Sequence, residues 1–275
     1  MFEDNNLILF LMCIVPIVFY SIVIFANSPT FSIRFKASLN YLFIGLLSIT
    51  LLQFIHFIFP HLHDTFFKIN LGDFTLKDKY FEVYQKTFNS LLLYAFVQVA
   101  LMEEVSKWMA FKCVDFMRGK RRKNLDHPYA IMFYSALVSA AFAIAENIQY
   151  AQRTMAGEFG DNVTPENVLI IRAVTSVIIH MTCGLIMGYY IALGKGISVI
   201  RKILYNIIGI AAATFMHGIY DLNWMKPGTE KDYYNLFPDF PIHVSSVIII
   251  GFSLVIAFIM SQNLKHIRHS EIKQQ

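Results

Sequence analysis

The chain carries little charge: only 15% of its 275 residues are Asp, Glu, Lys or Arg, whereas 56% are hydrophobic. A soluble domain of this size needs far more polar surface, so the scarcity of charge excludes a soluble globular protein. Cysteine is also scarce, and Cys13, Cys113 and Cys183 share no metal-binding or redox spacing. We interpret them as inert, small apolar residues.

Linkers, low-complexity segments and internal repeats are likewise missing from the sequence. The absence of linkers predicts one integral membrane domain over residues 1–275. The absence of a repeat argues against the transporter folds that are built from two related halves.

Long apolar runs make up most of the chain. Seven runs of about 20 residues match the ~30 Å hydrocarbon thickness of a bilayer. They lie at 7–26, 39–59, 90–113, 129–151, 168–192, 203–222 and 241–260. The first run follows Glu3 and Asp4 rather than a basic segment and is too long for a signal peptide, so we expect it to remain as a span. The sequence predicts an all-α fold, a polytopic bundle of about seven transmembrane helices in the cell (cytoplasmic) membrane.

Lysine and arginine divide unequally between the two sets of connections. Thirteen lie after the first, third and fifth runs and in the tail, and seven lie in the alternate connections. Because basic residues gather on the cytoplasmic side, we expect the N-terminus outside and the C-terminus inside. The basic run at 118–123 lacks interleaved aromatic residues, so we interpret it as an anchor near anionic headgroups and expect no nucleic-acid binding.

Four apolar runs carry ionisable side chains, each of which costs roughly 2.5–3.5 kcal/mol at mid-bilayer on insertion scales. Residues three or four apart share a helix face, and the polar residues that are spread along a run keep that spacing. The groups are Glu103, Glu104 and Lys107; Glu146 with Asn147; Arg172, Ser176 and His180; and His217 with Asp221. Because lipid satisfies none of them, we expect these four helices to turn their polar stripes toward one another.

Adjacent carboxylates at Glu103 and Glu104 suit acid–base chemistry. Two acids held together in a low dielectric cannot both ionise cheaply, and Lys107 one turn away stabilises the one that stays charged. The other can take a proton from water, while a histidine on a neighbouring helix stabilises an oxyanion or delivers a proton. These groups suit amide hydrolysis by an activated water. Each stripe alone also has a structural interpretation, such as a buried ion pair, so the prediction depends on all four occurring together.

These motifs resemble those of the PrsW intramembrane proteases. The matching segments are Glu103-Glu104-Val-Ser-Lys107, Phe142-Ala-Ile-Ala-Glu146-Asn147, Arg172 with His180, and His217-Gly-Ile-Tyr-Asp221, within a region of about 90–222. The chain is also distantly similar to the CAAX prenyl endopeptidases and to bacteriocin-processing membrane proteases. In the prenyl endopeptidases the second motif ends in His, and Glu146 stands there instead, which argues against a prenylated substrate.

The resemblance implies an intramembrane endopeptidase that makes the first cut in a membrane-anchored protein, such as an anti-sigma factor, near the outer face. It implies that Glu103 activates water and that Glu104 is held by Lys107. Glu146 would complete the carboxylate side, with Asn147 as a hydrogen-bond donor. It further implies that His217, with Asp221, stabilises the oxyanion, that His180 moves a proton or binds the water, and that Arg172 supports the site.

Three alternatives stay open at this point. Catalysis by glutamate without a metal is favoured, because no His-Glu-x-x-His helix is present; the metal alternative has Zn²⁺ held by Glu103, Glu146, His180 and His217. A proton-coupled transporter is the second functional class, since buried acids and histidines also form proton relays. A catalytically silent membrane scaffold is the third.

One geometric condition follows from the positions of these residues along their helices. Glu103 and His180 fall near mid-membrane, whereas Glu146 and His217 fall in the outer third, a spread on the order of 10 Å along the membrane normal. A single site therefore requires tilted or interrupted helices, or a water-filled opening to the outer face.

Overall fold

The structure is a computed structural model that describes Val18 and residues 35–58, 92–118, 127–157, 164–224 and 242–273. The all-α prediction is confirmed within these ranges, which contain helices and no strand. The helices are α2 (Phe35–Ile58), η1 (Tyr94–Leu101), α6 (Met102–Arg118), α7 (Pro128–Met155), α8 (Pro165–Val174), α9 (Ser176–Leu193), α10 (Val199–Trp224) and α11 (Ile242–Lys273).

Four segments are long and apolar enough to cross a membrane, judged by length and composition. They are Lys36–Ile55, Pro128–Met155, Pro165–Leu193 and Val199–Trp224, and they coincide with the second, fourth, fifth and sixth expected spans. The third expected span coincides with η1 and α6, and the seventh with the first part of α11, whose apolar stretch Val247–Met260 is shorter. The first expected span, 7–26, lies outside the described residues except for Val18. The count of seven spans stays a prediction.

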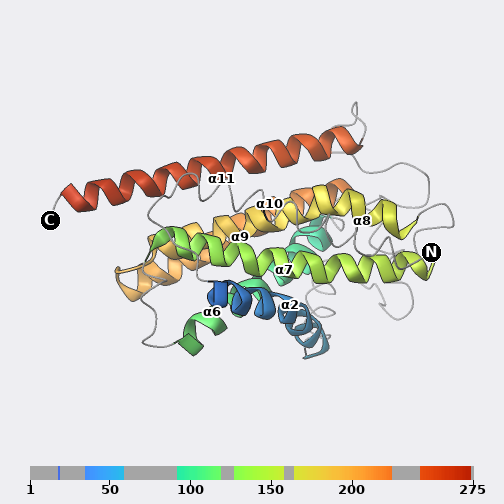
Figure 1. Cartoon of the computed structure of the whole chain (residues 1–275), viewed down its shortest axis with the longest axis horizontal. Helices are drawn as coiled ribbons and strands as arrows, with labels where there is room; N and C mark the ends of the chain where they lie inside the picture. Colours follow the sequence, from blue (N-terminus) through green and yellow to red (C-terminus); the bar gives the residue numbers. More distant parts are fainter. Residues whose placement is uncertain are drawn as a thin grey trace.

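The centre of the bundle is the contact between α7 and α9, which lie side by side along the long axis of the molecule (Figure 1). Small residues allow this close approach, as is common between membrane helices. A Cβ atom added at Gly184 would lie 2.6 Å from Ser139 Oγ and 2.7 Å from the Ser135 carbonyl oxygen. One added at Gly188 would lie 2.6 Å from Met132 Cα. The backbones of α7 and α9 therefore meet without intervening side chains at these two positions.

Replacement of Gly184 by Ala is expected to destabilise the bundle. The added methyl group meets backbone atoms of α7 that cannot rotate away, and overpacking of this kind costs about 1–3 kcal/mol. Gly251 in α11 provides the matched control, because nothing lies within 4 Å of a Cβ atom built there. Thermal unfolding of the purified protein in detergent should show a lower midpoint for Gly184→Ala and an unchanged or higher one for Gly251→Ala. Equal midpoints would contradict the close α7–α9 contact.

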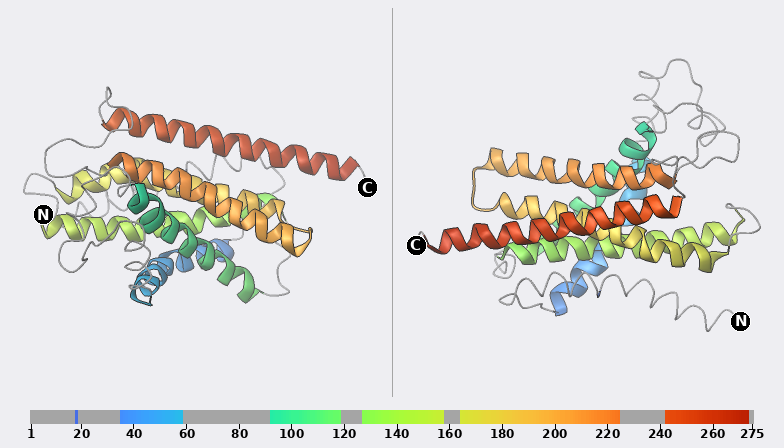
Figure 2. Two further views of the ribbon diagram at one scale, coloured as in Figure 1. Left: turned by 180° about the vertical axis from the view of Figure 1, so that it is seen from behind. Right: turned by 90° about the horizontal axis from the view of Figure 1, so that it is seen from above.

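Two irregular segments set the positions of polar residues. Residues 94–101 form a π-helix, and α6 continues directly from it at Met102, so that η1 and α6 together cross α10 obliquely (Figure 2). The expected continuous span at 168–192 is instead two helices, because Thr175, with φ −119° and ψ −68°, interrupts the helix between α8 and α9. The Thr175 hydroxyl bonds to the carbonyl of Ile171 at 2.8 Å and to the hydroxyl of Tyr220 at 2.8 Å. The interruption is thereby tied to α10.

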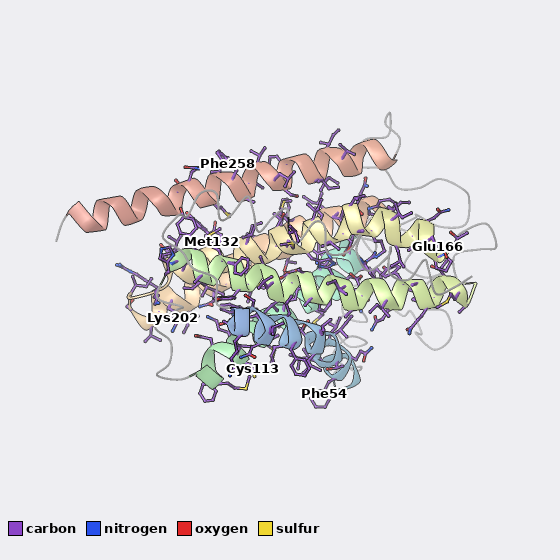
Figure 3. The ribbon with its side chains drawn as sticks, in the orientation of Figure 1. Phe54, Cys113, Met132, Glu166, Lys202 and Phe258 are labelled. Atoms are coloured by element: carbon purple, nitrogen blue, oxygen red, sulfur yellow. The ribbon has the colours of Figure 1, made fainter. Side chains whose placement is uncertain are left out.

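Glu166 and Lys202 mark the two ends of the bundle, and the orientation of these ends in the membrane stays a prediction. Glu166, in the first turn of α8, and Lys202, in the first turns of α10, lie at opposite ends of the molecule (Figure 3). The helix interruption and the polar residues of α8 belong to the end that carries Glu166. That end is the one predicted to face outward.

Candidate active site

Five helices, α6 to α10, deliver ionisable side chains to one place inside the bundle. Glu103 and Glu104 stand in the first turn of α6, immediately after the π-helix. Phe96 of η1 packs against Gly218 of α10, where a Cβ atom would lie only 2.6 Å from the ring. This contact brings the start of α6 close to the helix turn that carries His217.

Lys107 lies at the centre of the cluster and is 1% exposed. Its Nζ atom donates to Glu104 Oε1 at 2.7 Å and lies 2.7 Å from His180 Nδ1 and 3.4 Å from Glu103 Oε2. It also lies 4.4 Å above the ring of Phe142, a cation–π contact. The i, i+3 and i, i+4 pairings with both acids are those that the sequence predicts. Lys107 thus joins α6 to α9.

The second group of contacts surrounds Glu146 on α7. Its Oε2 atom lies 2.9 Å from His180 Nε2 and 2.7 Å from Arg172 Nη2. Arg172 also donates from Nε to Asn147 Oδ1 at 2.7 Å and from Nη2 to Ser176 Oγ at 3.1 Å, and its guanidinium stacks 3.7 Å above the Tyr150 ring. The side-chain amide oxygen of Asn147 therefore accepts a hydrogen bond that holds Arg172 in place.

His217 of α10 completes the cluster. Its Nδ1 atom lies 2.8 Å from Glu104 Oε1, and its Nε2 atom lies 3.3 Å from Asp221 Oδ2 and 3.7 Å from Glu103 Oε2. A nitrogen lone pair facing two carboxylates would be repelled, so Nε2 must carry a proton or face a cation. The rings of His180 and His217 meet edge to face, with centroids 4.7 Å apart.

Exposure rises from one side of the cluster to the other. The side chains of Glu104 and Lys107 are fully buried, whereas those of Glu146 and Arg172 are each 14% exposed and that of Asp221 is 16% exposed. The most accessible part of the cluster is therefore the part formed by Glu146, Arg172 and Asp221. Four carboxylates face two permanent cations, so with both imidazoles neutral the cluster carries a net charge of −2, which two protons or a divalent cation would balance.

All nine residues singled out in the sequence lie in this cluster. The contacts above connect Glu103, Glu104, Glu146, His180 and His217 with the supporting residues Lys107, Asn147, Arg172 and Asp221. The sequence placed Glu103 and His180 deeper in the membrane than Glu146 and His217. The oblique course of η1 and α6 and the interruption at Thr175 bring these side chains together. The sequence reasoning missed the Thr175–Tyr220 hydrogen bond; a tyrosine inside an apolar helix is the signal, because its hydroxyl needs a partner.

Comparison with known proteins matches this arrangement to a family. The family model described as PrsW family intramembrane metalloprotease matches residues 41–263, which is most of the chain. The chain belongs to the PrsW family. The match includes all five helices that carry the cluster and extends the similarity beyond the region of about 90–222 that the motifs mark.

Two similar proteins in this family carry the name Protease PrsW. The one from Oceanobacillus iheyensis is 31% identical over 135 residues, which cover 49% of this chain and 55% of that protein. The one from Geobacillus kaustophilus is 32% identical over 138 residues, covering 50% of this chain and 53% of that protein. The chain thus spans about half the length of the PrsW proteases it matches. No solved structure matches it.

The description of the PrsW family as metalloproteases raises the question of a metal ion. Glu103, His180 and His217 are buried, and their ligand atoms lie within 4.8 Å of one another, a grouping that could hold one. His217 suits this role, since its Nδ1 pairs with Glu104 and its Nε2 faces Glu103, the usual arrangement for a ligand histidine. His180 does not, because Lys107 and Glu146 occupy both of its ring nitrogens. As arranged here, the three residues do not fit a metal ion.

Proposed function

We propose that the chain is an intramembrane peptidase that hydrolyses a peptide bond of a membrane-anchored protein by glutamate-activated water. The observation that carries the proposal is one continuous chain of polar contacts built from five helices inside an apolar bundle. It runs from Arg172 through Glu146, His180, Lys107 and Glu104 to His217. Burying so many charges is costly, and a bundle that needed only packing would not require them. Membership in the PrsW family supports a peptidase.

In the proposed reaction Glu103 is the general base. Its carboxylate takes a proton from water, whose oxygen then attacks the carbonyl carbon of the substrate peptide bond. His217, oriented by Glu104 and Asp221, faces Glu103 from α10 and stabilises the oxyanion that forms. The C–N bond breaks as the proton that Glu103 took from water reaches the leaving amine, through His180 and Glu146, and the Glu103 carboxylate is restored.

The proposed site of cutting follows from exposure and orientation. The partly exposed side chains Glu146, Arg172 and Asp221 lie on the predicted outer side, so water and an unwound substrate segment would arrive from there. We therefore propose a first cut near the outer face of a single-span protein of the anti-sigma-factor kind. This proposal includes the seven-span arrangement with the N-terminus outside and the C-terminus inside.

Profiling of membrane-protein N-termini tests the proposed function. Cells that express the wild type are compared with cells that express Glu103→Gln at the same abundance. The proposal expects new N-termini near the outer face of at least one single-span protein, present with the wild type alone. Substrate-dependent proton flux in proteoliposomes, together with identical N-termini in the two strains, would instead indicate a proton-coupled transporter.

A further inference from the structure

Lys107 links the acids of α6 to the group of contacts around Glu146, because its Nζ atom reaches Glu104 on one side and His180 on the other. An ammonium group has three N–H bonds, and the three polar neighbours of Nζ are Glu104 Oε1, His180 Nδ1 and Glu103 Oε2. A divalent ion held by Glu103 and His180 would have to approach two of these same three groups. The ammonium therefore competes directly with a metal for its ligands.

The hydrogen bond from Lys107 also fixes the tautomer of His180. Because Nζ donates to Nδ1, the ring proton must be on Nε2, and Nε2 accordingly donates to Glu146 Oε2 at 2.9 Å. Arg172 donates to the same carboxylate oxygen and stabilises this arrangement. Both nitrogens of His180 are thus used, and no lone pair is left for a metal.

Electrostatics acts in the same direction as geometry. A divalent cation bound by Glu103 and His180 would lie within a few ångströms of the Lys107 ammonium, in a site where both residues are nearly or fully buried. At such separations the repulsion between like charges amounts to several kcal/mol even at an effective dielectric constant of about 20. Since Nζ already lies 2.7 Å from Glu104 Oε1, the negative charge that would attract the ion is partly neutralised.

We infer that the Lys107 ammonium takes the place of a metal ion in this site, and that the cluster becomes a divalent-cation site only when Lys107 is removed. Lys107 is then a positioning residue: it holds Glu104 and sets the tautomer of His180. The inference rests on the proposed function for its catalytic meaning. Its test, which measures metal binding, does not depend on activity.

The test measures zinc binding to the full-length protein, purified in detergent, freed of metal and titrated with Zn²⁺ against a chromophoric chelator. Lys107→Ala removes the ammonium and leaves room for an ion next to Glu103, Glu104 and His180. Lys107→Arg keeps the charge and serves as the matched control. Lys107→Ala/His180→Ala shows whether a newly formed site uses His180. Lys107→Gln, which retains an uncharged hydrogen-bond donor, replaces Lys107→Ala if that variant fails to fold.

The inference predicts no stoichiometric zinc in the wild type or in Lys107→Arg. It predicts one bound zinc in Lys107→Ala, with affinity about 100-fold or more above the wild type, and loss of that gain in the double variant. One equivalent of tightly bound zinc in the wild type would overturn it, as would equal affinities in wild type and Lys107→Ala. If the wild type binds no zinc but cuts no protein in cells, the proposed function fails while this inference stands.

Discussion

Replacement of Glu103 by Gln is expected to lower the rate of substrate cleavage at least about 1,000-fold. A general base contributes 10²–10⁴ to a rate, and here its loss also removes the group that faces His217 Nε2 at 3.7 Å. Glutamine has nearly the same size and still accepts a hydrogen bond from Lys107, so the abundance of the protein should not change. The rate is measured on the substrate that N-terminus profiling identifies, in proteoliposomes that contain purified protein.

Two further variants separate the role of the carboxylate from general effects of charge. Glu103→Asp keeps the charge but shortens the side chain by one methylene. Displacement of the carboxylate on that scale predicts a cleavage rate about 100-fold lower. Glu166→Gln removes an acid from the first turn of α8, outside the cluster, and should cut at the wild-type rate. A Glu103→Gln protein that cuts within tenfold of the wild type would contradict the assignment of Glu103 as base.

Replacement of Arg172 by Met should affect both folding and activity. Arg172 Nη2 lies 2.7 Å from Glu146 Oε2, and each side chain is only 14% exposed, so the change leaves a mostly buried carboxylate without its cation. Breaking a buried ion pair in this way costs about 3–5 kcal/mol. The orientation of Glu146 toward His180 is also lost, and we expect cleavage to fall about 100-fold even where folded protein remains. Thermal unfolding and cleavage of the folded fraction measure the two effects separately.

The contacts of Arg172 also predict the effect of a conservative change. Lysine supplies the charge for Glu146 but cannot at the same time donate to Asn147 and stack on Tyr150, so Arg172→Lys should restore only part of both properties. Arg201→Met, at an exposed position near the start of α10, is the matched control and should resemble the wild type. An Arg172→Met protein as stable as this control would show that the ion pair contributes little.

The helices and the polar cluster were largely predictable from the sequence, because lipid leaves so few solutions for a buried charge. The i, i+3 and i, i+4 pairs of Glu103 and Glu104 with Lys107 appear in the structure as ion pairs, and the requirement that four polar stripes face one another led directly to the contacts of His180 and His217. Spacing within a helix is a local property, so it can be predicted directly from the sequence.

The relative heights of the polar groups could not be predicted in the same way. They depend on the π-helix at 94–101 and on the interruption at Thr175, neither of which has a proline or glycine to mark it. The central position of Lys107 could not be predicted from the sequence either, because its contact with His180 joins residues 73 positions apart. The sequence suggested a lysine that serves two acids, and only the packing of α6 against α9 and α10 gives it a histidine as well.

Hydrolysis in ¹⁸O-labelled water tests the central claim most directly. Purified wild type and Glu103→Gln, in proteoliposomes with the identified single-span substrate, are incubated in labelled water, and the products are examined by mass spectrometry. The account predicts one labelled oxygen in the new carboxyl terminus, at a bond near the outer face, and product with the wild type alone. Equal product from both proteins, or no product from pure wild type on a substrate that is cut in cells, would contradict it.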